Sequence, residues 1–263
     1  MSNPFHKFGL EHLSPSQLNT FSESPAMWVL ERLLGHKRST AAPLHAGKAV
    51  EAGVVAGLLY PNMEDGACIE IAQDAFKTEL LTARFSNGGD PRVPKYIEAI
   101  PGMVRQGLHH LRPYGVPTST QSKVEYQPEE LVVPIQGFCD LQYDDSGVLI
   151  DIKTTLRMPP GNEENGYEVK LTYARQVSFY KHCINDNYGA YLAYLTDKKG
   201  AVCSVPDTRQ HRDALVRIAL ILQRFLSLSD DKHELAGLVC PDYEHFMFND
   251  SRARRAALDI WGF

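Results

Sequence analysis

Long apolar runs are missing from this chain. No stretch reaches the roughly 18–20 apolar residues that a membrane-spanning helix requires, and residues 1–8 lack the basic segment and apolar stretch of a secretory leader. Internal repeats and low-complexity tracts are missing too. We therefore expect a protein of the cytoplasm with no membrane partner.

Cysteine is scarce and scattered. The cysteines are odd in number, and none forms a CxxC pair. This spacing excludes a disulfide framework and a zinc ribbon as the basis of the fold. We expect reduced, mostly buried thiols. The five residues are Cys68, Cys139, Cys183, Cys203 and Cys240.

The chain has no excess of positive charge. Its formal net charge is −5, which argues against a protein that coats nucleic acid, because phosphate binding needs clustered Lys and Arg. An enzyme that concentrates acid at a metal site and has a local basic groove stays compatible with this charge. The sequence also lacks the GxxxxGK[ST] motif, so it carries no Walker-type nucleotide-hydrolysing motor.

What is present is enough for a large core, with 263 residues of which 43% are hydrophobic. Ser14-Pro15 and Ser24-Pro25 each combine a capping Ser with Pro at the first helical position, so both predict the start of a helix. The middle of the chain is β-rich, and helical periodicity returns after it. Beyond the helix that begins at Pro15, we expect helices at 26–34, 46–60, 69–82, 101–111, 171–185, 208–227 and 251–258, and strands at 122–126, 131–143, 148–155 and 190–196.

This order of elements predicts an α/β fold with a central mixed β-sheet flanked by helices and with helical N- and C-terminal additions. We expect a single domain over 1–263. It would comprise a helical N-terminal element at 1–40, a core at 41–200 and a helical C-terminal part at 201–263. No linker marks a boundary, although a separate domain at 1–40 stays open.

The turn Asp-Asp-Ser-Gly at 144–147 should join two strands into an antiparallel hairpin. If Tyr143 faces Val148, Asp140 lies directly opposite Asp151, with Cβ atoms about 4.5–5.5 Å apart. Two carboxylates this close repel each other unless a proton or a cation lies between them. A hard divalent cation with oxygen ligands resolves the conflict.

Strand alternation puts Lys153 on the same face as Asp151, with Ile150 and Ile152 on the other face. An alternative interpretation is that these are solvated charges on an exposed hairpin. However, the strand that begins at Val148 is apolar on both faces apart from the Asp. This pattern favours a largely buried strand whose carboxylate needs a partner.

Asp140, ten further residues and then Asp151-Ile-Lys153 resemble the PD-(D/E)XK nuclease signature. The surrounding Gly137-Phe-Cys-Asp and Leu-Ile-Asp-Ile-Lys-Thr-Thr resemble its RecB-type branch. The resemblance implies a restriction-endonuclease-like core around the mixed sheet and hydrolysis of phosphodiester bonds. A bare D-x-K occurs by chance in most proteins, so the remaining motifs matter.

Three further motifs follow the order of that family. The segment 13–25 resembles the Ser-x-Ser-x-x-x-Phe/Tyr-x-x-Cys-Pro element of the branch. Gly47-Lys-Ala-Val-Glu51 is similar to the helix motif Gly-x-x-x-His/Glu, with the Glu of lambda-exonuclease-like members. Gln176-Val-Ser-Phe-Tyr180 resembles the Gln-x-x-x-Tyr motif. Taken singly, Glu51 as a surface acid and the Gln–Tyr pair as ordinary helix residues are the alternatives.

By this resemblance, one or two Mg²⁺ (or Mn²⁺) ions are the cofactor. The implied ligands are Glu51, Asp140, Asp151 and the backbone carbonyl of Ile152. Lys153 would orient the attacking water or stabilise the charged transition state.

The resemblance also implies that Gln176 and Tyr180 complete the catalytic set and hold a DNA phosphate or position the cut strand. Further candidates for DNA contact are Ser16, Arg157 and Arg175. Glu125, one strand before the hairpin, is a further candidate acid.

The chain departs from the branch at its cysteines. Some RecB-type members hold an iron–sulfur cluster with the Cys of a Cys-Pro pair and three cysteines near the C-terminus. Here Ser24 precedes Pro25, and only Cys240 lies in the C-terminal region. We therefore expect no iron–sulfur cluster.

Basic residues for a DNA groove occur only in fragments, and we expect most of them to be solvated faces. The fragments are His36-Lys37-Arg38, Arg157, Lys170 with Arg175, and Arg252, Arg254 and Arg255. Phe21, Trp28 and Tyr167 are candidates for stacking on unpaired bases, although core packing is the commoner fate of an aromatic residue.

The leading hypothesis is a metal-dependent DNA exonuclease that acts on ends or single strands in recombination, repair or phage DNA processing. One alternative is a structure-specific or single-strand endonuclease. Another, of a different class, is a non-catalytic DNA- or partner-binding module on the same fold. The implied partners are DNA and a recombination or single-strand-annealing protein, in a bacterial or phage-infected cytoplasm. The oligomeric state stays open.

Overall fold

The computed structural model describes residues 3–86 and 89–262. The chain divides into two units, each assembled from separate segments. The first, the helical unit, comprises Met1–Ser39, Lys123–Gly137 and Arg209–Phe263, and the second, the sheet unit, comprises Thr40–Ser122 and Phe138–Thr208. The single domain over the whole chain stays a prediction.

A five-stranded sheet of order β1-β2-β3-β6-β7 forms the centre of the fold. β3 pairs in parallel with β6, whereas the β2–β3 and β6–β7 pairs are antiparallel. The mixed sheet flanked by helices is therefore confirmed. The strands are β1 (Ser119–Tyr126), β2 (Ile135–Tyr143), β3 (Val148–Thr154), β6 (Gly189–Leu195) and β7 (Gly200–Ser204).

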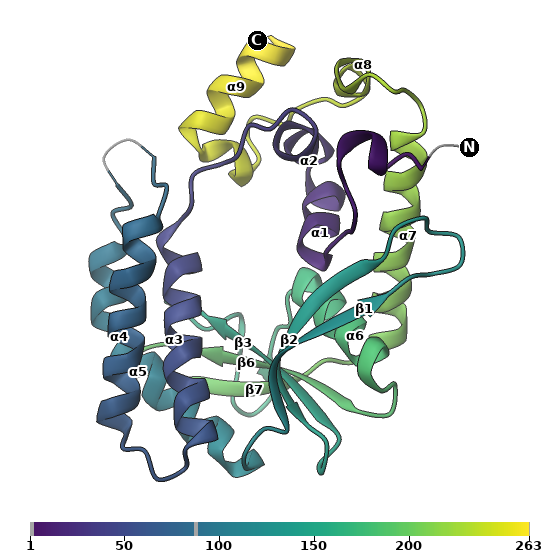
Figure 1. Ribbon diagram of the computed structural model, residues 1–263. Helices are drawn as coiled ribbons and strands as arrows, with labels where there is room; N and C mark the ends of the chain where they lie inside the picture. Colours follow the sequence, from purple (N-terminus) through teal and green to yellow (C-terminus); the bar gives the residue numbers. More distant parts are fainter. Residues whose placement is uncertain (1–2, 87–88, 263) are drawn as a thin grey trace. The chain divides into compact units, whose positions relative to one another are not determined.

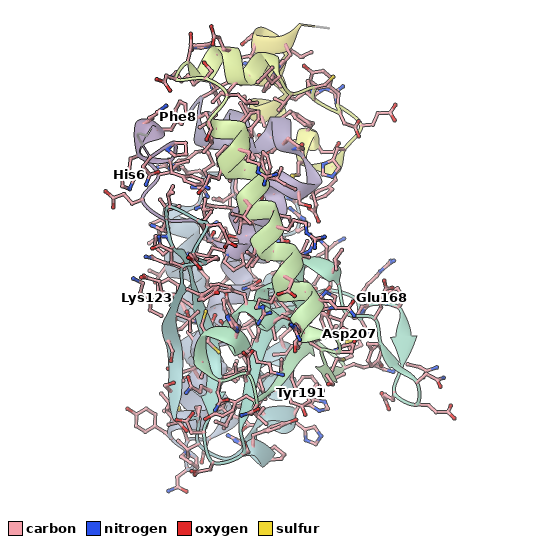
Figure 2. The ribbon with its side chains drawn as sticks, turned by 90° about the vertical axis from the view of Figure 1, so that its right-hand side faces the viewer. His6, Phe8, Lys123, Glu168, Tyr191 and Asp207 are labelled. Atoms are coloured by element: carbon pink, nitrogen blue, oxygen red, sulfur yellow. The ribbon has the colours of Figure 1, made fainter. Side chains whose placement is uncertain are left out.

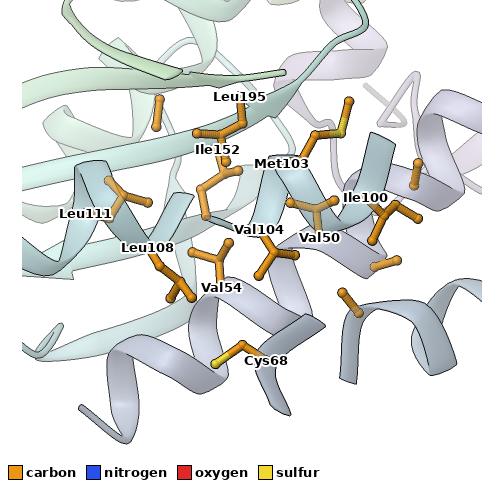
Figure 3. Packing of buried hydrophobic residues seen from close by; sticks show 14 of the residues in the cluster. Val50, Val54, Cys68, Ile100, Met103, Val104, Leu108, Leu111, Ile152 and Leu195 are labelled. Atoms are coloured by element: carbon orange, nitrogen blue, oxygen red, sulfur yellow. The ribbon is translucent and has the colours of Figure 1, made fainter. Parts of the chain in front are cut away.

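Three helices of the sheet unit lie together beside the sheet, namely α3 (Ala42–Leu59), α4 (Asp65–Thr82) and α5 (Val93–Leu111) (Figure 1). Val50 and Val54 of α3 pack with Leu108 of α5 and with Ile152 and Leu195 of the strands (Figure 3). This cluster is the main core of the unit. Ile150 and Ile152 of β3 belong to this core, whereas Leu149, which points to the other face, is buried outside it. β3 is therefore covered on both faces.

Close approach of α3 and α4 depends on glycine. A Cβ built on Gly53 would lie 2.4 Å from the backbone carbonyl oxygen of Cys68 and 2.9 Å from Cβ of Ala72. Backbone at that distance cannot yield as a flexible side chain does. The small residue therefore sets how tightly these two helices pack.

The other face of the sheet carries α6 (Leu171–Ile184), which connects β3 to the parallel strand β6. A parallel pair needs such a crossover. Before α6, the short strands β4 (Gly161–Asn162) and β5 (Gly166–Tyr167) form an antiparallel ribbon. The backbone N–H of Glu168, a residue labelled in Figure 2, donates to the carbonyl of Pro160 at 2.7 Å. This hydrogen bond closes the ribbon.

The helical unit has a core of its own. Met27, Leu30 and Phe248 are buried in one cluster. Trp28 is fully buried, and its ring meets that of Phe21 edge-on at 5.6 Å. The helices of this unit are α1 (Pro15–Glu23), α2 (Pro25–Arg32), α7 (Thr208–Leu226), α8 (Lys232–Gly237) and α9 (Ser251–Trp261), with 3₁₀ turns η1 (His6–Phe8) and η3 (Phe246–Asn249), and a further turn, η2 (Arg112–Tyr114), follows α5 in the sheet unit.

The capping prediction for the first two helices is confirmed. The Ser14 side chain accepts from the N–H of Gln17, and the Ser24 side chain accepts from the N–H of Met27. Gly35 adopts a φ of 80° just after α2, the left-handed conformation that ends helices.

The predicted start of one helix was wrong, and the short elements β4, β5, β7 and α8 were not among the predictions. α5 begins at Val93 rather than at Pro101, which lies inside the helix. The buried stripe that includes Tyr96 and Ile100 continues the helix before the proline, and its packing outweighs the lost N–H bond. The short edge strand β7 was not expected at all. Within 3–86 and 89–262, no helix has the length and apolar character needed to cross a bilayer.

Asp90 caps α3 from a neighbouring loop. Its Oδ2 accepts from the N–H of Ala42 at 2.8 Å, and Arg92 pairs with both carboxylate oxygens. The hydrogen bonds from the Arg92 side chain, together with that N–H, lower the pKa of Asp90 to about 2. Its ordinary value is 3.8.

Asp90→Ala should lower the free energy of unfolding by about 1 kcal/mol, the usual cost of losing a helix cap. Because the folded pKa is depressed, the contribution is complete above the ordinary pKa of 3.8 and disappears as the pH falls toward 2. Urea unfolding at pH 7, and at steps below pH 4, measures the difference from the parent protein. Asp74→Ala, which removes an exposed pair with Lys77 on α4, is the control and should cost little. An unchanged difference down to about pH 2 would contradict this account.

Candidate metal-dependent active site

Asp151 and Lys153 of β3 lie on the face of the sheet that carries α6. Asp151 is 1% exposed, and its Oδ1 accepts from Nε2 of Gln176 on α6 at 3.3 Å. Nζ of Lys153 lies 2.5 Å from Oδ2 of the same carboxylate. Ile152, between them in sequence, belongs to the opposite core. The shared face predicted from strand alternation is confirmed, and so is the burial predicted from the apolar residues on both faces of the strand.

The hairpin has the predicted register, with Tyr143 opposite Val148 and Leu141 opposite Ile150. One position further along β2, the Asp140 side chain, and not a backbone carbonyl, accepts a hydrogen bond from β3. Its Oδ2 accepts from the N–H of Ile152 at 2.8 Å. The carbonyl of a strand residue points to the same side as its N–H. The Ile152 carbonyl is therefore directed to the side of β3 on which Asp140 lies.

Glu51 reaches the same place from α3. Nε2 of Gln121, on β1, donates both to Oε1 of Glu51 and to Oδ1 of Asp140, the latter at 2.8 Å. Glu51 and Asp140 are thus linked through one amide although they lie 89 positions apart in the sequence. The motif resemblance identified Glu51, but no sequence signal identified Gln121.

Electrostatics connect the three carboxylates. The pKa of Asp140 is raised well above its ordinary value by burial first and then by the charges of Asp151 and Glu51. Burial also raises the pKa of Glu51, against the hydrogen bond from Gln121. For Lys153, burial lowers the pKa, but Asp151 and Asp140 more than offset this effect, and the pKa is raised. Three carboxylates therefore oppose one ammonium group that stays protonated.

Gln176 and Tyr180 lie behind the acidic cluster. Nε2 of Gln176 donates to the Tyr180 hydroxyl at 2.7 Å as well as to Asp151. The Tyr180 side chain is 4% exposed, and burial together with the Asp151 charge raises its pKa. These contacts suit a pair that holds Asp151 in position. A contact of either residue with a DNA phosphate stays a prediction.

An aromatic ring on α6 also touches the site. Nζ of Lys153 lies 4.8 Å from the centroid of the Tyr173 ring, and Nζ of Lys170 lies 5.7 Å from the same centroid. The face of an aromatic ring attracts a cation at such distances. No sequence signal identified Tyr173, because a single aromatic residue three positions before Gln176 is ordinary on a helix.

The other candidates lie elsewhere. Arg175 is on α6, next to Gln176, and Arg157 is exposed in the loop after β3. Ser16 is exposed on α1 of the helical unit, where its Oγ lies 3.0 Å from that of Ser14. Glu125, also in the helical unit, lies 3.2 Å from Lys123 and is not among the residues joined at the cluster. Contacts of Arg175, Arg157 and Ser16 with DNA stay predictions.

Aromatic packing answers one question left open by the sequence. Trp28 is fully buried and Phe21 is 7% exposed, and each contacts the other. Both are core residues of the helical unit, as the commoner interpretation holds. Tyr167 on β5 is half-buried.

The donor chemistry fits a hard divalent cation. Glu51, Asp140 and Asp151 offer carboxylate oxygens, and the Ile152 carbonyl faces the same side, which is the oxygen-only set that Mg²⁺ prefers. Across residues 3–86 and 89–262, no three His, Cys, Asp or Glu side chains already stand in metal-binding geometry. Within this cluster, Nε2 of Gln121 donates to two of the acids. Members of PD-(D/E)XK families generally use divalent ions.

Comparison with known proteins agrees with the site. No curated protein matches the chain. The model of the PD-(D/E)XK nuclease superfamily matches residues 12–239, which is most of the 263-residue sequence. That range contains the Asp140 to Lys153 hairpin, Glu51 and the mixed sheet on which they are placed. The chain therefore belongs to the PD-(D/E)XK nuclease superfamily.

Proposed function

We propose that the protein is a metal-dependent DNA exonuclease of the RecB-type and lambda-exonuclease-like branch. The observation that carries this proposal is the convergence of Glu51, Asp140 and Asp151 with the ammonium of Lys153 in the sheet unit. Superfamily membership supports nuclease chemistry. The divalent ion, Mg²⁺ or Mn²⁺, and the choice of DNA ends are part of the proposal.

The acids form the binding part of the site. Glu51 and Asp140 already direct one oxygen each at a common point, the Nε2 of Gln121. Asp151 and the Ile152 carbonyl add donors from the adjacent strand. When bound there, a divalent cation polarises the phosphate and lowers the pKa of an attacking water. Without a bound cation, these three carboxylates would repel the negatively charged phosphodiester.

Lys153 supplies a positive charge from the protein. Its side chain is 19% exposed, and its ammonium pairs with Asp151. A raised pKa keeps it charged at neutral pH. From this position it can donate to an attacking water or to a non-bridging phosphate oxygen, where charge accumulates in the transition state.

Residues of α6 position Asp151 and Lys153. Gln176 bonds the Oδ1 of Asp151, and Tyr180 holds the amide of Gln176. Tyr173 lies against the Lys153 ammonium. These contacts leave the nucleophile-activating groups with few alternative rotamers, which is what a precisely oriented displacement at phosphorus requires.

The biological setting we propose is recombination, repair or phage DNA processing in a bacterial or phage-infected cytoplasm. A recombination or single-strand-annealing protein is the expected partner. These points rest on the motif resemblance. The absence of an iron–sulfur cluster stays a prediction.

One assay tests the proposed function. End-labelled and circular DNA, each single- and double-stranded, are incubated with Mg²⁺, Mn²⁺ or EDTA. We expect release of nucleotides from linear DNA in either metal and none in EDTA. Cleavage of circles would replace the exonuclease with an endonuclease. No cleavage of any substrate would favour a binding module on the same fold.

A further inference from the structure

Gln121 joins two carboxylates from different elements. It lies on β1, whereas Asp140 lies on β2 and Glu51 on α3, and all three belong to the sheet unit. Its single amide nitrogen uses both of its hydrogens, one for each acid. Two like-charged groups thus converge on one donor atom.

The backbone at Gln121 is unusual. Its φ is 49°, in the left-handed region, and the only other non-glycine residue with positive φ among residues 3–86 and 89–262 is Asp207. Side chains other than Gly, Asn and Asp adopt this region at a cost, which persists where other contacts compensate for it. The residue is exposed, so core packing does not hold its side chain. Its hydrogen bonds to the two carboxylates hold the side chain instead.

We propose that the Gln121 amide occupies the cation position of the metal-free protein and that the divalent ion must displace it. Mg²⁺ binds oxygens at about 2.0–2.1 Å. An ion in contact with Oε1 of Glu51 and Oδ1 of Asp140 therefore takes the space of the amide nitrogen. This inference rests on the proposed function, because it takes those two acids as metal ligands.

The displacement reduces the apparent metal affinity. Only the fraction of molecules in which the amide has turned away can accept the ion, and the apparent dissociation constant rises in inverse proportion to that fraction. In exchange, the amide relieves repulsion between the acids when no ion is bound. Gln121 therefore stabilises the apo protein and competes with its cofactor.

Two variants and one control test the proposal without relying on cleavage. Gln121→Ala removes the amide. Gln121→Asn shortens it, so that it reaches one acid at most, and Asn tolerates the left-handed backbone. The control is Gln142→Ala on β2, whose amide donates to Asp144 at the hairpin turn instead. Metal binding is measured by Mn²⁺ electron paramagnetic resonance and by Mg²⁺ calorimetry in the absence of DNA.

We expect Gln121→Ala to bind Mn²⁺ about 3–10-fold more tightly than the parent protein, which corresponds to about 0.7–1.4 kcal/mol and matches the small net contribution of hydrogen bonds from an exposed amide. Gln121→Asn should show a smaller gain, and Gln142→Ala no gain. In EDTA, Gln121→Ala should melt at a lower temperature than the parent, and saturating Mn²⁺ should remove that deficit.

Other outcomes overturn the proposal. Unchanged Mn²⁺ affinity in Gln121→Ala would show that the amide does not compete, and weaker affinity would show that it is a ligand. An equal gain in Gln142→Ala would make the effect nonspecific. If the parent protein bound neither ion, the proposed function would fail as well. If it bound both but cut no DNA, only the proposed function would fail.

Discussion

Replacing Lys153 by Met should slow single-turnover DNA cleavage by on the order of 10²–10³-fold, the usual effect of removing one donor from the transition state. Met keeps the unbranched apolar stem of the side chain, one atom shorter, and removes its charge. Since Glu51, Asp140 and Asp151 remain, Mn²⁺ affinity should be unchanged or higher. The rate at saturating metal and the Mn²⁺ dissociation constant separate these two effects.

The same substitution should destabilise the metal-free protein. Asp151 is 1% exposed and would lose the ammonium 2.5 Å from its Oδ2. Breaking a buried pair from one side costs about 3–5 kcal/mol. Saturating Mn²⁺ should recover much of this loss. Lys199→Met, which removes an exposed partner of Glu163, is the control for loss of a surface Lys. Full cleavage activity in Lys153→Met would exclude Lys153 from the chemistry.

Asp140→Asn should have opposite effects on activity and on stability. The neutral side chain keeps its shape, and its carbonyl oxygen can still accept from the N–H of Ile152. A metal ligand is lost, so Mn²⁺ affinity and cleavage should each fall by at least about 100-fold, since loss of even an outer partner costs about 10–100-fold.

In EDTA, however, Asp140→Asn should be more stable than the parent protein. The cluster has three carboxylates against one ammonium, and the substitution removes one of the repelling charges. A gain on the order of 1 kcal/mol follows, or about 2–4 °C in melting temperature for a chain of this size. Asp145→Asn, in the exposed hairpin turn, should change neither property. A destabilised Asp140→Asn with normal Mn²⁺ affinity would contradict the assignment of Asp140 as a ligand.

Local rules predicted much of the site. The four-residue turn set the register in which Tyr143 faces Val148, and strand alternation placed Lys153 beside Asp151. Both results depend on residues close in sequence, so turn length and strand period suffice to derive them. The helix caps at Ser14 and Ser24 are local for the same reason.

Longer-range packing decided the rest. Pro101 was expected to begin α5, but the buried stripe of that helix extends it back to Val93. The strand β7 is a short edge strand, and it is specified by its pairing with β6 more than by its own residues. Neither result follows from a window of sequence, because each depends on a partner elsewhere in the chain.

The surroundings of Gln121 show most clearly what the sequence determined and what only the tertiary structure decided. By itself the sequence determined which groups carry charge, that Asp140 and Asp151 share a hairpin, and that Lys153 accompanies them. Only the tertiary structure brought Glu51 from α3 to Asp140 and put an amide of β1 between the two. Hairpin geometry follows from neighbouring residues, whereas the meeting of a helix with a strand end depends on core packing. The core of α3, α5 and β3, with Val54, Leu108 and Ile152 among its members, supplies that packing.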